Sequence, residues 1–548
     1  MPTDKSETEH WYYGAAILLL SALYYGLYLN IGFSAADDGN YAQIAYELYL
    51  GRAPEELAIN YGILWFKIGE GLFHVFGVNY VLVKIFFFAV IAATNILIFY
   101  TINVMSGSRL FALTMTAVPL IVPAFPATAF YGFCILLNAA AQMRIAAKIT
   151  RVTWIDAAIA GAALSLSFQI RPDFGYIWTV PLTLLLLAAT FKSSSTHRTW
   201  ELFGAAIAAF FIVQAPLLVS AMNGGYAGLV LQQYMSYPAT MVDYALSGVR
   251  ALISGNVAQP DSAGSTSLQR PGLTAIGSAN TARSSLAILI YLPVIAIGGF
   301  VAVNILLIAK RWRAGRFDVV AQSLVALFAA AAAFPHYFFY RPDLSHVANF
   351  MPGYVILAAA IILQLYQTRQ ATAIPWQRWA TLTGLSAAFI HLTFFLWVGL
   401  QTPGTGSIAV ANGRAEPFEA GNGIDVTVST AEKARLEIVR NAVLQNSEPK
   451  DRIVCVPYCP GFAFMSERRM LFKNFYVDDS MLVLDPNWIP DAIELTRDVR
   501  PPVVVVLDWA INGTEISRFK NWASDYIAVL EELSQETIEH PGFTIYLL

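Results

Sequence analysis

Charged residues are scarce in this chain of 548 residues, making up only 13% of it, against about 25% in ordinary soluble proteins. Hydrophobic residues make up 57%, and several separate stretches reach the roughly 20 apolar residues that a helix needs to cross a membrane. The shortage of charge therefore excludes an ordinary soluble protein. The composition predicts a mainly α-helical, polytopic membrane protein whose first partner is the lipid bilayer.

Motifs of nucleotide use are also missing. The sequence has no Walker A lysine loop, no glycine-rich dinucleotide turn, no basic tail and no heptad array, so we do not expect an ATP-driven machine. The net charge of −3 gives no indication of a nucleic-acid partner. Three cysteines are too few for a metal framework. Cys455 and Cys459, in CVPYC, either pair in an oxidising compartment or are two small residues near a strand end.

The apolar stretches predict about eleven membrane helices. They lie at residues 12–33, 80–104, 110–125, 128–147, 154–170, 174–191, 200–222, 284–309, 318–338, 347–367 and 379–400. The short connections rich in Lys and Arg belong on the cytoplasmic side by the positive-inside rule. With a cytoplasmic N-terminus, all of them fall on that side of an inner (plasma) membrane. Residues 34–79 and 223–283, the turns at Arg171 and Arg341, and the C-terminus then lie outside.

The composition changes near residue 401. Residues 1–400 form the predicted membrane domain, and its segment 223–283 is rich in Gly, Ser and Ala, as flexible loops are. After residue 401, TAEKARLEIVRNAVLQ has helical periodicity, whereas RIVCVPY, PPVVVVLDW and FTIYLL resemble buried strands. We therefore predict a small soluble α/β domain at 401–548, outside the membrane.

The first external segment contains two adjacent acids, Asp37 and Asp38, directly after the first membrane helix. Residues 41, 44, 45 and 48 follow at the spacing of one apolar helix face. A second amphipathic stretch, INYGILWFKIGEGLFHVFG, predicts another helix at the membrane surface. One explanation of the acids is helix capping, and Asn40 with Gln43 resembles a capping box. The other is a chemical task, because an acid at the hydrocarbon edge is costly without one.

Two further external turns repeat the triplet Arg-Pro-Asp. They are RPDFGY, with Arg171 and Asp173, and RPDLSH, with Arg341, Asp343 and His346. Each triplet is either an Arg–Asp ion pair at a helix break or part of an anion site, since guanidinium groups bind phosphate bidentately. Acids and cations on one face suit a lipid-phosphate substrate: the acids accept a proton and the cations offset the charge of the leaving phosphate.

Other side chains have two interpretations each. Lys84 is either a phosphate contact or a lysine that extends to the headgroups. Tyr41, Tyr61, Tyr337 and Tyr340 either stack on a sugar or belong to the aromatic belt. His74 and His336 are expected to pack at the interface.

The segment DDGNYA, with Glu47 ten residues after Asp37, resembles the Asp-Glu-x-x-Tyr-Ala…Glu signature of GT-C glycosyltransferases of the ArnT, PMT and RgtA/B/C/D-like group. That signature lies in the first periplasmic loop, as here, and a GR-P element (51–54) follows in both. Asp38 stands where many relatives have Glu, and Asn60-Tyr61-Gly62 stands near the place of their Pro-Pro element.

The resemblance implies a GT-C fold and an inverting transfer of a sugar from a polyprenyl-phosphate-linked donor to a lipid, glycan or protein acceptor outside the cytoplasm. It implies that Asp37 is the general base, with Asp38 as the alternative. Some relatives bind a divalent metal, but no spacing here requires one. We predict phosphate contacts from Arg341, His346, Arg171 and Lys84, and substrate contacts from Tyr41, Glu47, Tyr61, Tyr340 and Asp343.

Two other functions are compatible with the sequence. A transporter or lipid flippase would show polar or broken helices at mid-membrane and repeated halves, whereas here the ionisable groups gather at one predicted surface. A polymerase or ligase that joins lipid-linked glycans would share the donor chemistry, and the long segment 223–283 keeps it open.

Overall fold

The computed structural model describes residues 5–59, 61–191, 196–236, 275–277, 279–335, 337–338, 344–371, 375–401, 407–479, 481–511 and 515–548. The chain divides into two compact units. Unit 1 comprises Met1–Leu27, Phe87–Leu246 and Arg270–Ala409, and unit 2 comprises Tyr28–Phe86, Ser247–Gln269 and Val410–Leu548. This division differs from the predicted boundary at residue 400, because it groups the first loop with the C-terminal residues.

Eight helices of the described part are long and apolar enough to cross a membrane. They are Tyr80–Ser106 (α4), Pro126–Ala147 (with α6, Phe130–Ala147), Pro172–Phe191 (α8), His197–Asn223 (in α9, Thr196–Asn223), Thr281–Ile305 (in α11, Thr281–Arg313), Phe317–Pro335 (α12), Leu344–Gln367 (in α13, Leu344–Ala371) and Leu382–Gln401 (in α14, Pro375–Gln401). Three shorter apolar helices are Tyr12–Gly26 (in α1, Lys5–Gly26), Arg109–Ile121 (α5) and Trp154–Ile170 (α7). Each predicted membrane helix overlaps one of these eleven, so the polytopic helical class is confirmed. The first ends at Gly26 instead of residue 33.

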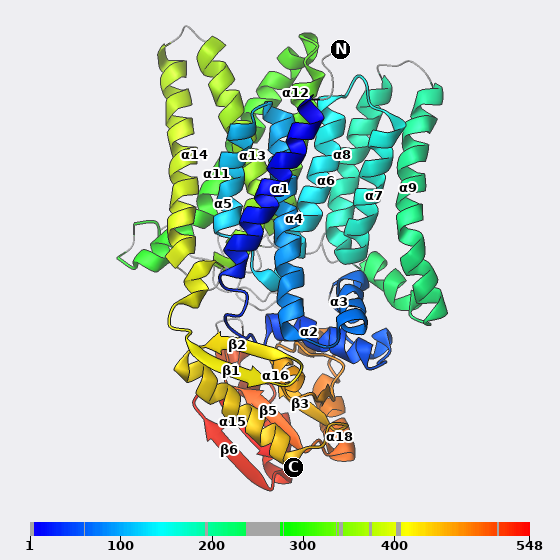
Figure 1. Ribbon diagram of the computed structural model, residues 1–548, viewed down its shortest axis with the longest axis vertical. Helices are drawn as coiled ribbons and strands as arrows, with labels where there is room; N and C mark the ends of the chain where they lie inside the picture. Colours follow the sequence, from blue (N-terminus) through cyan, green and yellow to red (C-terminus); the bar gives the residue numbers. More distant parts are fainter. Residues whose placement is uncertain are drawn as a thin grey trace. The chain divides into compact units, whose positions relative to one another are not determined.

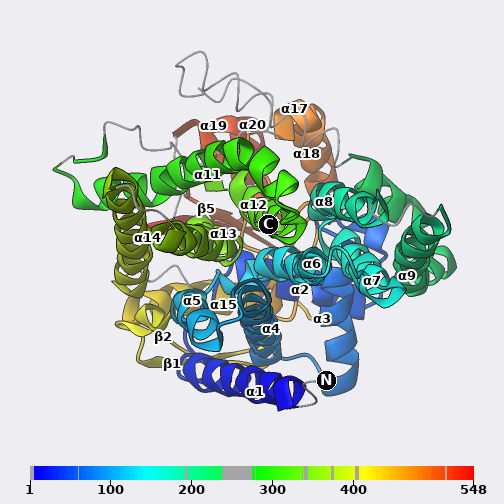
Figure 2. The same ribbon diagram turned by 90° about the horizontal axis from the view of Figure 1, so that it is seen from above.

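Unit 1 is a bundle with α6 and α13 at its centre, where 83% and 78% of the two spans is buried. The spans of α9 and α14 are only 22% buried and lie at opposite edges of the bundle (Figure 2). Small residues bring the central helices together, as is usual in membranes. A Cβ on Gly353 of α13 would lie 2.1 Å from the carbonyl oxygen of Ala329 in α12, so this crossing requires glycine.

Unit 2 contains a five-stranded sheet in the order β4-β3-β5-β7-β6. Its strands are β3 (Arg452–Val456), β4 (Arg469–Met470), β5 (Val503–Leu507), β6 (Glu536–His540) and β7 (Phe543–Leu547). β4 and β5 pair with β3 in parallel, whereas β7 pairs with β5 and β6 antiparallel. The three predicted strands are β3, β5 and β7, and the continuous apolar run of β5 matches its central, buried position.

Helices cover the sheet, and a small hairpin precedes it (Figure 1). The predicted helix of TAEKARLEIVRNAVLQ is α15 (Thr430–Asn446), which begins with a capping box formed by Ser429 and Glu432. The others are α16 (Gly461–Met465), α17 (Met481–Leu484), α18 (Trp488–Val499), α19 (Phe519–Trp522) and α20 (Ser524–Leu533), and the hairpin is β1 (Glu416–Ala420) with β2 (Ile424–Val428). The predicted α/β character of the C-terminal residues is confirmed.

The first loop also forms its two predicted helices, α2 (Asp37–Tyr49) and α3 (Ile63–Phe76). All four residues at the helical spacing, Tyr41, Ile44, Ala45 and Leu48, are at most 3% exposed. Gly69 of α3 allows close contact with α2, because a Cβ there would lie 2.7 Å from the hydroxyl of Tyr41. The apolar face of α2 is therefore buried in the interior of unit 2, in contact with α3.

Candidate active site

Asp37 and Asp38 are the first two residues of α2. The N-cap is Ala36, which makes no side-chain capping hydrogen bond, so neither acid occupies the N-cap position that the capping explanation required. The capping box proposed for Asn40 and Gln43 is absent too, since Gln43 donates to Glu47 and to the backbone of Arg468. Both acids lie at the positive end of the helix dipole, which favours negative charge.

Asp38 is buried, with 8% of the residue exposed. Its Oδ2 accepts a hydrogen bond of 3.3 Å from the hydroxyl of Tyr80, whereas its buried Oδ1 has no partner among the described residues. Burial raises the pKa of the Asp38 carboxyl from 3.8 to about 6, against the attraction of Lys84, and the charge of Asp37 adds to the rise. A perturbed carboxyl with an unused oxygen is typical of a functional site.

Lys84 lies one turn after Tyr80 in α4, and it is only 4% exposed. Its Nζ donates to the backbone oxygens of Ile31 at 2.7 Å and Gly32 at 3.5 Å. The side chain therefore does not extend into solvent, as the alternative explanation required. It is instead a buried cation fixed by the segment that leads into α2, and its charge acts on Asp38.

The C-terminal part of unit 2 contributes Tyr458, which sequence reasoning missed. Its hydroxyl donates a hydrogen bond of 3.2 Å to Oδ1 of Asp37. The ring of Tyr476 lies edge-on to it at 5.0 Å between centroids, and the Tyr476 hydroxyl donates to Asp478 at 2.9 Å. Asp37 is thus in contact with a residue more than 400 positions away. The only signal in the sequence was the CVPYC motif, whose tyrosine stands between the two cysteines.

Two glycines allow this approach. A Cβ on Gly39 would lie 2.6 Å from the Cα of Gly461, and one on Gly461 would lie 2.7 Å from the Cα of Ala35. The backbone N–H of Gly461 also donates to the carbonyl of Ala35 at 2.8 Å. Cys455 and Cys459 are both buried free thiols, so in this structure they are packing residues rather than a disulfide.

Two predicted substrate contacts lie in the interior of unit 2. Glu47 is 0% exposed; its Oε1 accepts from the N–H of Met470 at 2.7 Å, and its Oε2 accepts from Arg469 at 3.0 Å. Tyr41 is 2% exposed, donates to the carbonyl of Trp65 at 3.0 Å and packs among aromatic rings. Glu47 joins α2 to β4, and Tyr41 joins α2 to α3.

Arg171 and Asp173 form a buried ion pair in unit 1. The Nε of Arg171 lies 2.8 Å and 2.9 Å from the two carboxylate oxygens of Asp173, and the guanidinium lies 4.7 Å from the ring centre of Tyr131. This is the arrangement that the ion-pair interpretation predicted, at a break between α7 and α8. Its role as a phosphate contact, and its position near the acid pair, stay predictions.

The remaining candidate residues lie beside aromatic rings, at the start of α13 or outside the described part of the chain. Tyr61 is half-buried and lies 6.4 Å from the ring of Phe66, and His346 is half-buried in the first turn of α13. Tyr337 is fully buried, 4.2 Å from the ring of Phe350. His74 packs on the ring of Tyr49 at 4.8 Å. The predicted contacts Tyr340, Arg341 and Asp343, and also His336, lie outside the described residues.

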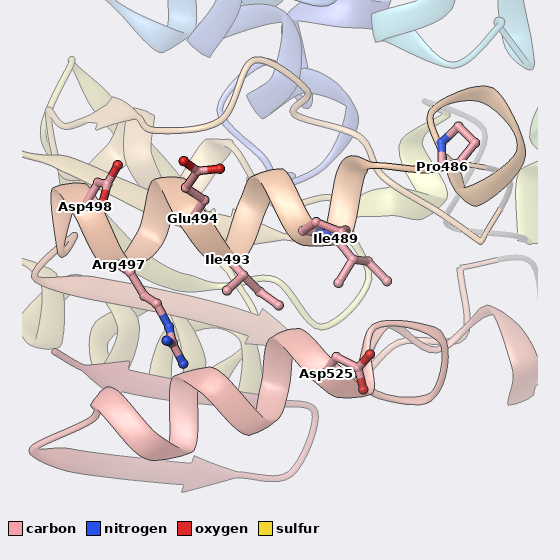
Figure 3. Close-up of a pocket in the computed structure, with 8 residues that line it drawn as sticks. Pro486, Ile489, Ile493, Glu494, Arg497, Asp498 and Asp525 are labelled. Carbon is pink, nitrogen blue, oxygen red and sulfur yellow. The ribbon is translucent and has the colours of Figure 1, made fainter.

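No group of three or more His, Cys, Asp or Glu side chains is placed to hold a metal ion within the described residues. A hollow of about 640 Å³ lies between α18 and α20 in unit 2 and is lined by Ile489, Ile493 and the charged residues Glu494, Arg497, Asp498 and Asp525 (Figure 3). Arg497 is paired there with Glu532 at 2.7 Å. None of the side chains of the acid-pair site lines this hollow.

Comparison with solved structures gives several matches, among them two that cover most of this chain. ArnT from Cupriavidus metallidurans, solved bound to undecaprenyl phosphate, is 12% identical and is matched over 97% of both chains with a TM-score of 0.50. The oligosaccharyltransferase of Archaeoglobus fulgidus, solved in complex with zinc and sulfate, is 11% identical and is matched over 94% of this chain and 69% of that one, with a TM-score of 0.44. No family model and no curated protein sequence matches the chain. The similarity to ArnT confirms the predicted GT-C fold.

Proposed function

We propose that the chain is a membrane glycosyltransferase that moves a sugar from a polyprenyl-phosphate-linked donor to an acceptor hydroxyl on the extracytoplasmic side. The observation that carries the proposal is the acid pair at the start of α2, in which a buried carboxylate with an unused oxygen shares its site with a buried lysine. The fold shared with ArnT, which was solved bound to undecaprenyl phosphate, supports the donor class.

The chemistry is a single displacement at the anomeric carbon. The acceptor oxygen forms a bond to that carbon while the bond from the carbon to the donor phosphate oxygen breaks, which inverts the configuration. The hydroxyl proton goes to a carboxylate, and polyprenyl phosphate leaves with the bonding electrons. We assign the base to Asp37, because it is partly exposed, whereas Asp38 is buried.

The cations serve the leaving group in this proposal. Lys84 is fixed near Asp38 and offsets negative charge that develops on the phosphate. Arg171, Arg341 and His346 remain proposed contacts to the same phosphate, and Tyr61, Tyr340 and Asp343 remain proposed contacts to sugar or acceptor. A divalent cation beside the acids stays an expectation from the resemblance, and no step above uses one.

The test is mass spectrometry of envelope glycolipids and glycans from a strain that lacks the protein. We expect a glycosylated species to disappear, losing the mass of one sugar, and to return with the wild-type chain but not with Asp37→Asn. Asp425→Asn, an exposed acid on β2 of the same unit, is the matched control and should restore the species. Immunoblots of the membranes must show equal amounts of all variants.

Two outcomes would contradict the proposal at different levels. An unchanged glycan profile in the deletion strain would overturn the glycosyltransferase assignment. A lost species that Asp37→Asn restores in full would leave the transferase in place but remove Asp37 from the role of base.

A further inference from the structure

An apolar groove of about 670 Å³ lies in unit 1, between three membrane helices. Side chains of α8, α11 and α12 line it, and α12 lies between the other two helices (Figure 2). The lining includes Leu184, Ile305 and Leu324. None of the side chains of the acid-pair site lines this groove.

The rim of the groove is unusually open. Leu184 is 47% exposed, Ile305 65%, Ile308 46% and Phe191 86%. Aliphatic and aromatic side chains along a membrane helix normally face lipid chains, so exposure alone indicates nothing more than bilayer contact. Here, however, the exposed side chains surround a hollow instead of a flat helix face, which gives a single lipid chain a defined place to lie.

Arg311 gives the groove one charged end. Its Nη1 donates a hydrogen bond of 2.5 Å to Oδ1 of Asn304, seven residues earlier in α11, or about 10 Å back along the helix. Arginines near the end of a membrane helix usually extend toward the headgroups. The guanidinium of Arg311 instead turns back toward the apolar groove.

A polar network holds Asn304 in place. Gln364 of α13 donates to Ser323 of α12 at 3.0 Å, and Asn304 and Gln364 approach each other at 3.4–3.5 Å. Among the residues that the structure describes, Arg311 has no acidic partner. A guanidinium that is turned toward an apolar groove at the end of a membrane helix, with no acidic partner in the described part of the bundle, is placed to bind an anion.

We propose that this groove binds a phospholipid of the surrounding bilayer, with one acyl chain along the apolar walls and its phosphate on the guanidinium of Arg311. Guanidinium groups suit phosphate because they present parallel N–H donors and stay charged. Arg316 follows in the same basic connection, which the sequence predicts to face the cytoplasm. Basic pockets between helices on that side favour anionic headgroups, so phosphatidylglycerol is the lipid class we expect.

Native mass spectrometry of the full, delipidated chain in detergent tests the proposal with dioleoyl-phosphatidylglycerol as the probe. We expect one tightly retained lipid on the wild type and about tenfold weaker retention on Arg311→Gln. Arg313→Gln, an exposed arginine on the same helix, is the matched control and should retain the lipid. A second variant, Ala188→Trp, fills the groove while leaving Arg311 in place, and it should also lose the lipid.

Three results would overturn the proposal. Equal loss from Arg311→Gln and Arg313→Gln would mean that the lipid responds to general basic charge. Full retention of the lipid by Ala188→Trp would show that its acyl chain does not lie in the groove. Equally tight binding of dioleoylglycerol, which has no phosphate, would remove the contact to Arg311. None of these results depends on the glycosyltransferase proposal.

Discussion

Asp38 and Asp173 are both buried aspartates at the start of a helix, yet their surroundings differ. Asp173 is 0% exposed, and both of its oxygens accept from Arg171, only two residues away. Asp38 receives one long hydrogen bond from Tyr80 in another helix, and its Oδ1 has no partner in the described part of the chain. The hydrogen-bonding capacity of Asp173 is used by a cation in its own turn of the chain. Asp38 keeps one oxygen available for a ligand.

This difference indicates separate roles for the two sequence motifs, the Arg-Pro-Asp triplet and the acid pair. The Arg-Pro-Asp triplet at 171–173 closes on itself as an ion pair, which explains its position where α7 ends and α8 begins. The acid pair has no such closure and is supported from two distant parts of the chain, by Tyr80 in α4 and by Tyr458 after β3. We therefore expect changes to the first motif to lower stability, whatever they do to the proposed phosphate contact, and changes to the second to affect transfer with little loss of stability.

The largest effect is expected for Asp37→Asn. If Asp37 is the base, its amide cannot accept the acceptor's proton, and the rate of transfer should fall by about 10²–10⁴-fold. The change keeps the size of the side chain, so the thermal unfolding temperature should stay within a few degrees of the wild type. The measurement is sugar transfer by purified membranes from both strains. A variant with wild-type turnover would assign the base elsewhere.

Arg171→Met should produce the opposite pattern, with a large loss of stability. Removing one partner of a buried pair leaves an uncompensated charge on Asp173, at a cost of about 3–5 kcal/mol. The measurement is the unfolding temperature in detergent. Arg497→Met is the matched control, because it breaks a half-exposed pair with Glu532 for which about 0–1 kcal/mol is expected. Equal shifts of the unfolding temperature for both variants would show that the buried pair stabilises the fold no more than the exposed pair does.

Much of the fold could be predicted from the sequence, because the physical signals there are local. Apolar runs long enough for a bilayer marked every membrane helix, and the apolar spacing in 41–48 marked the buried face of α2. The run Val503–Val506 marked the central strand of the sheet. The short strands β4 and β6 and the β1–β2 hairpin were not predicted. The compact grouping of the first loop with the C-terminal residues was not predicted either, because it depends on contacts between segments far apart in the sequence.

The site could be predicted only in part. The acid pair and Lys84 stand out because charge is rare next to apolar helices. Glu47 and Tyr41 match the same motif, but their side chains are used in packing, which a motif cannot distinguish from binding. Tyr458 carried almost no signal of its own, because tyrosine is common here and its contact with Asp37 spans more than 400 residues.

The buried carboxyl of Asp38 predicts an intermediate effect that depends on pH. Its pKa is raised to about 6 in the folded protein, so between roughly pH 4 and pH 6 the folded chain binds this proton more tightly than the unfolded chain does. This group therefore favours folding most at low pH, and its contribution falls as the pH rises through that range. Asp38→Asn lacks this dependence, because asparagine stays neutral.

The unfolding temperatures of wild type and Asp38→Asn should be similar near pH 4 and should separate as the pH rises, with the variant the more stable above pH 6. A pKa shift of this size corresponds to a difference on the order of 2–3 kcal/mol. Asp173→Asn provides the contrast, because it should be less stable than the wild type at neutral pH. A constant difference between wild type and Asp38→Asn across the range would mean that Asp38 does not titrate there.

Tyr458→Phe should have the smallest effect and is the most specific test of the long-range contact. The change removes one hydrogen bond of 3.2 Å to Asp37, and a bond to an ionised group contributes about 1.5–3 kcal/mol. We expect transfer to fall by roughly 10- to 100-fold, and the acid limb of its pH profile to move to higher pH, because the bond favours the ionised carboxylate. Tyr476→Phe, which alters the neighbouring ring and its bond to Asp478, should leave that limb unchanged. If both variants lowered transfer equally without moving the profile, Tyr458 would be a packing residue. The hydrogen bond from Tyr80 of α4 to Asp38 of α2 would then remain as the long-range contact that distinguishes the acid pair from Asp173.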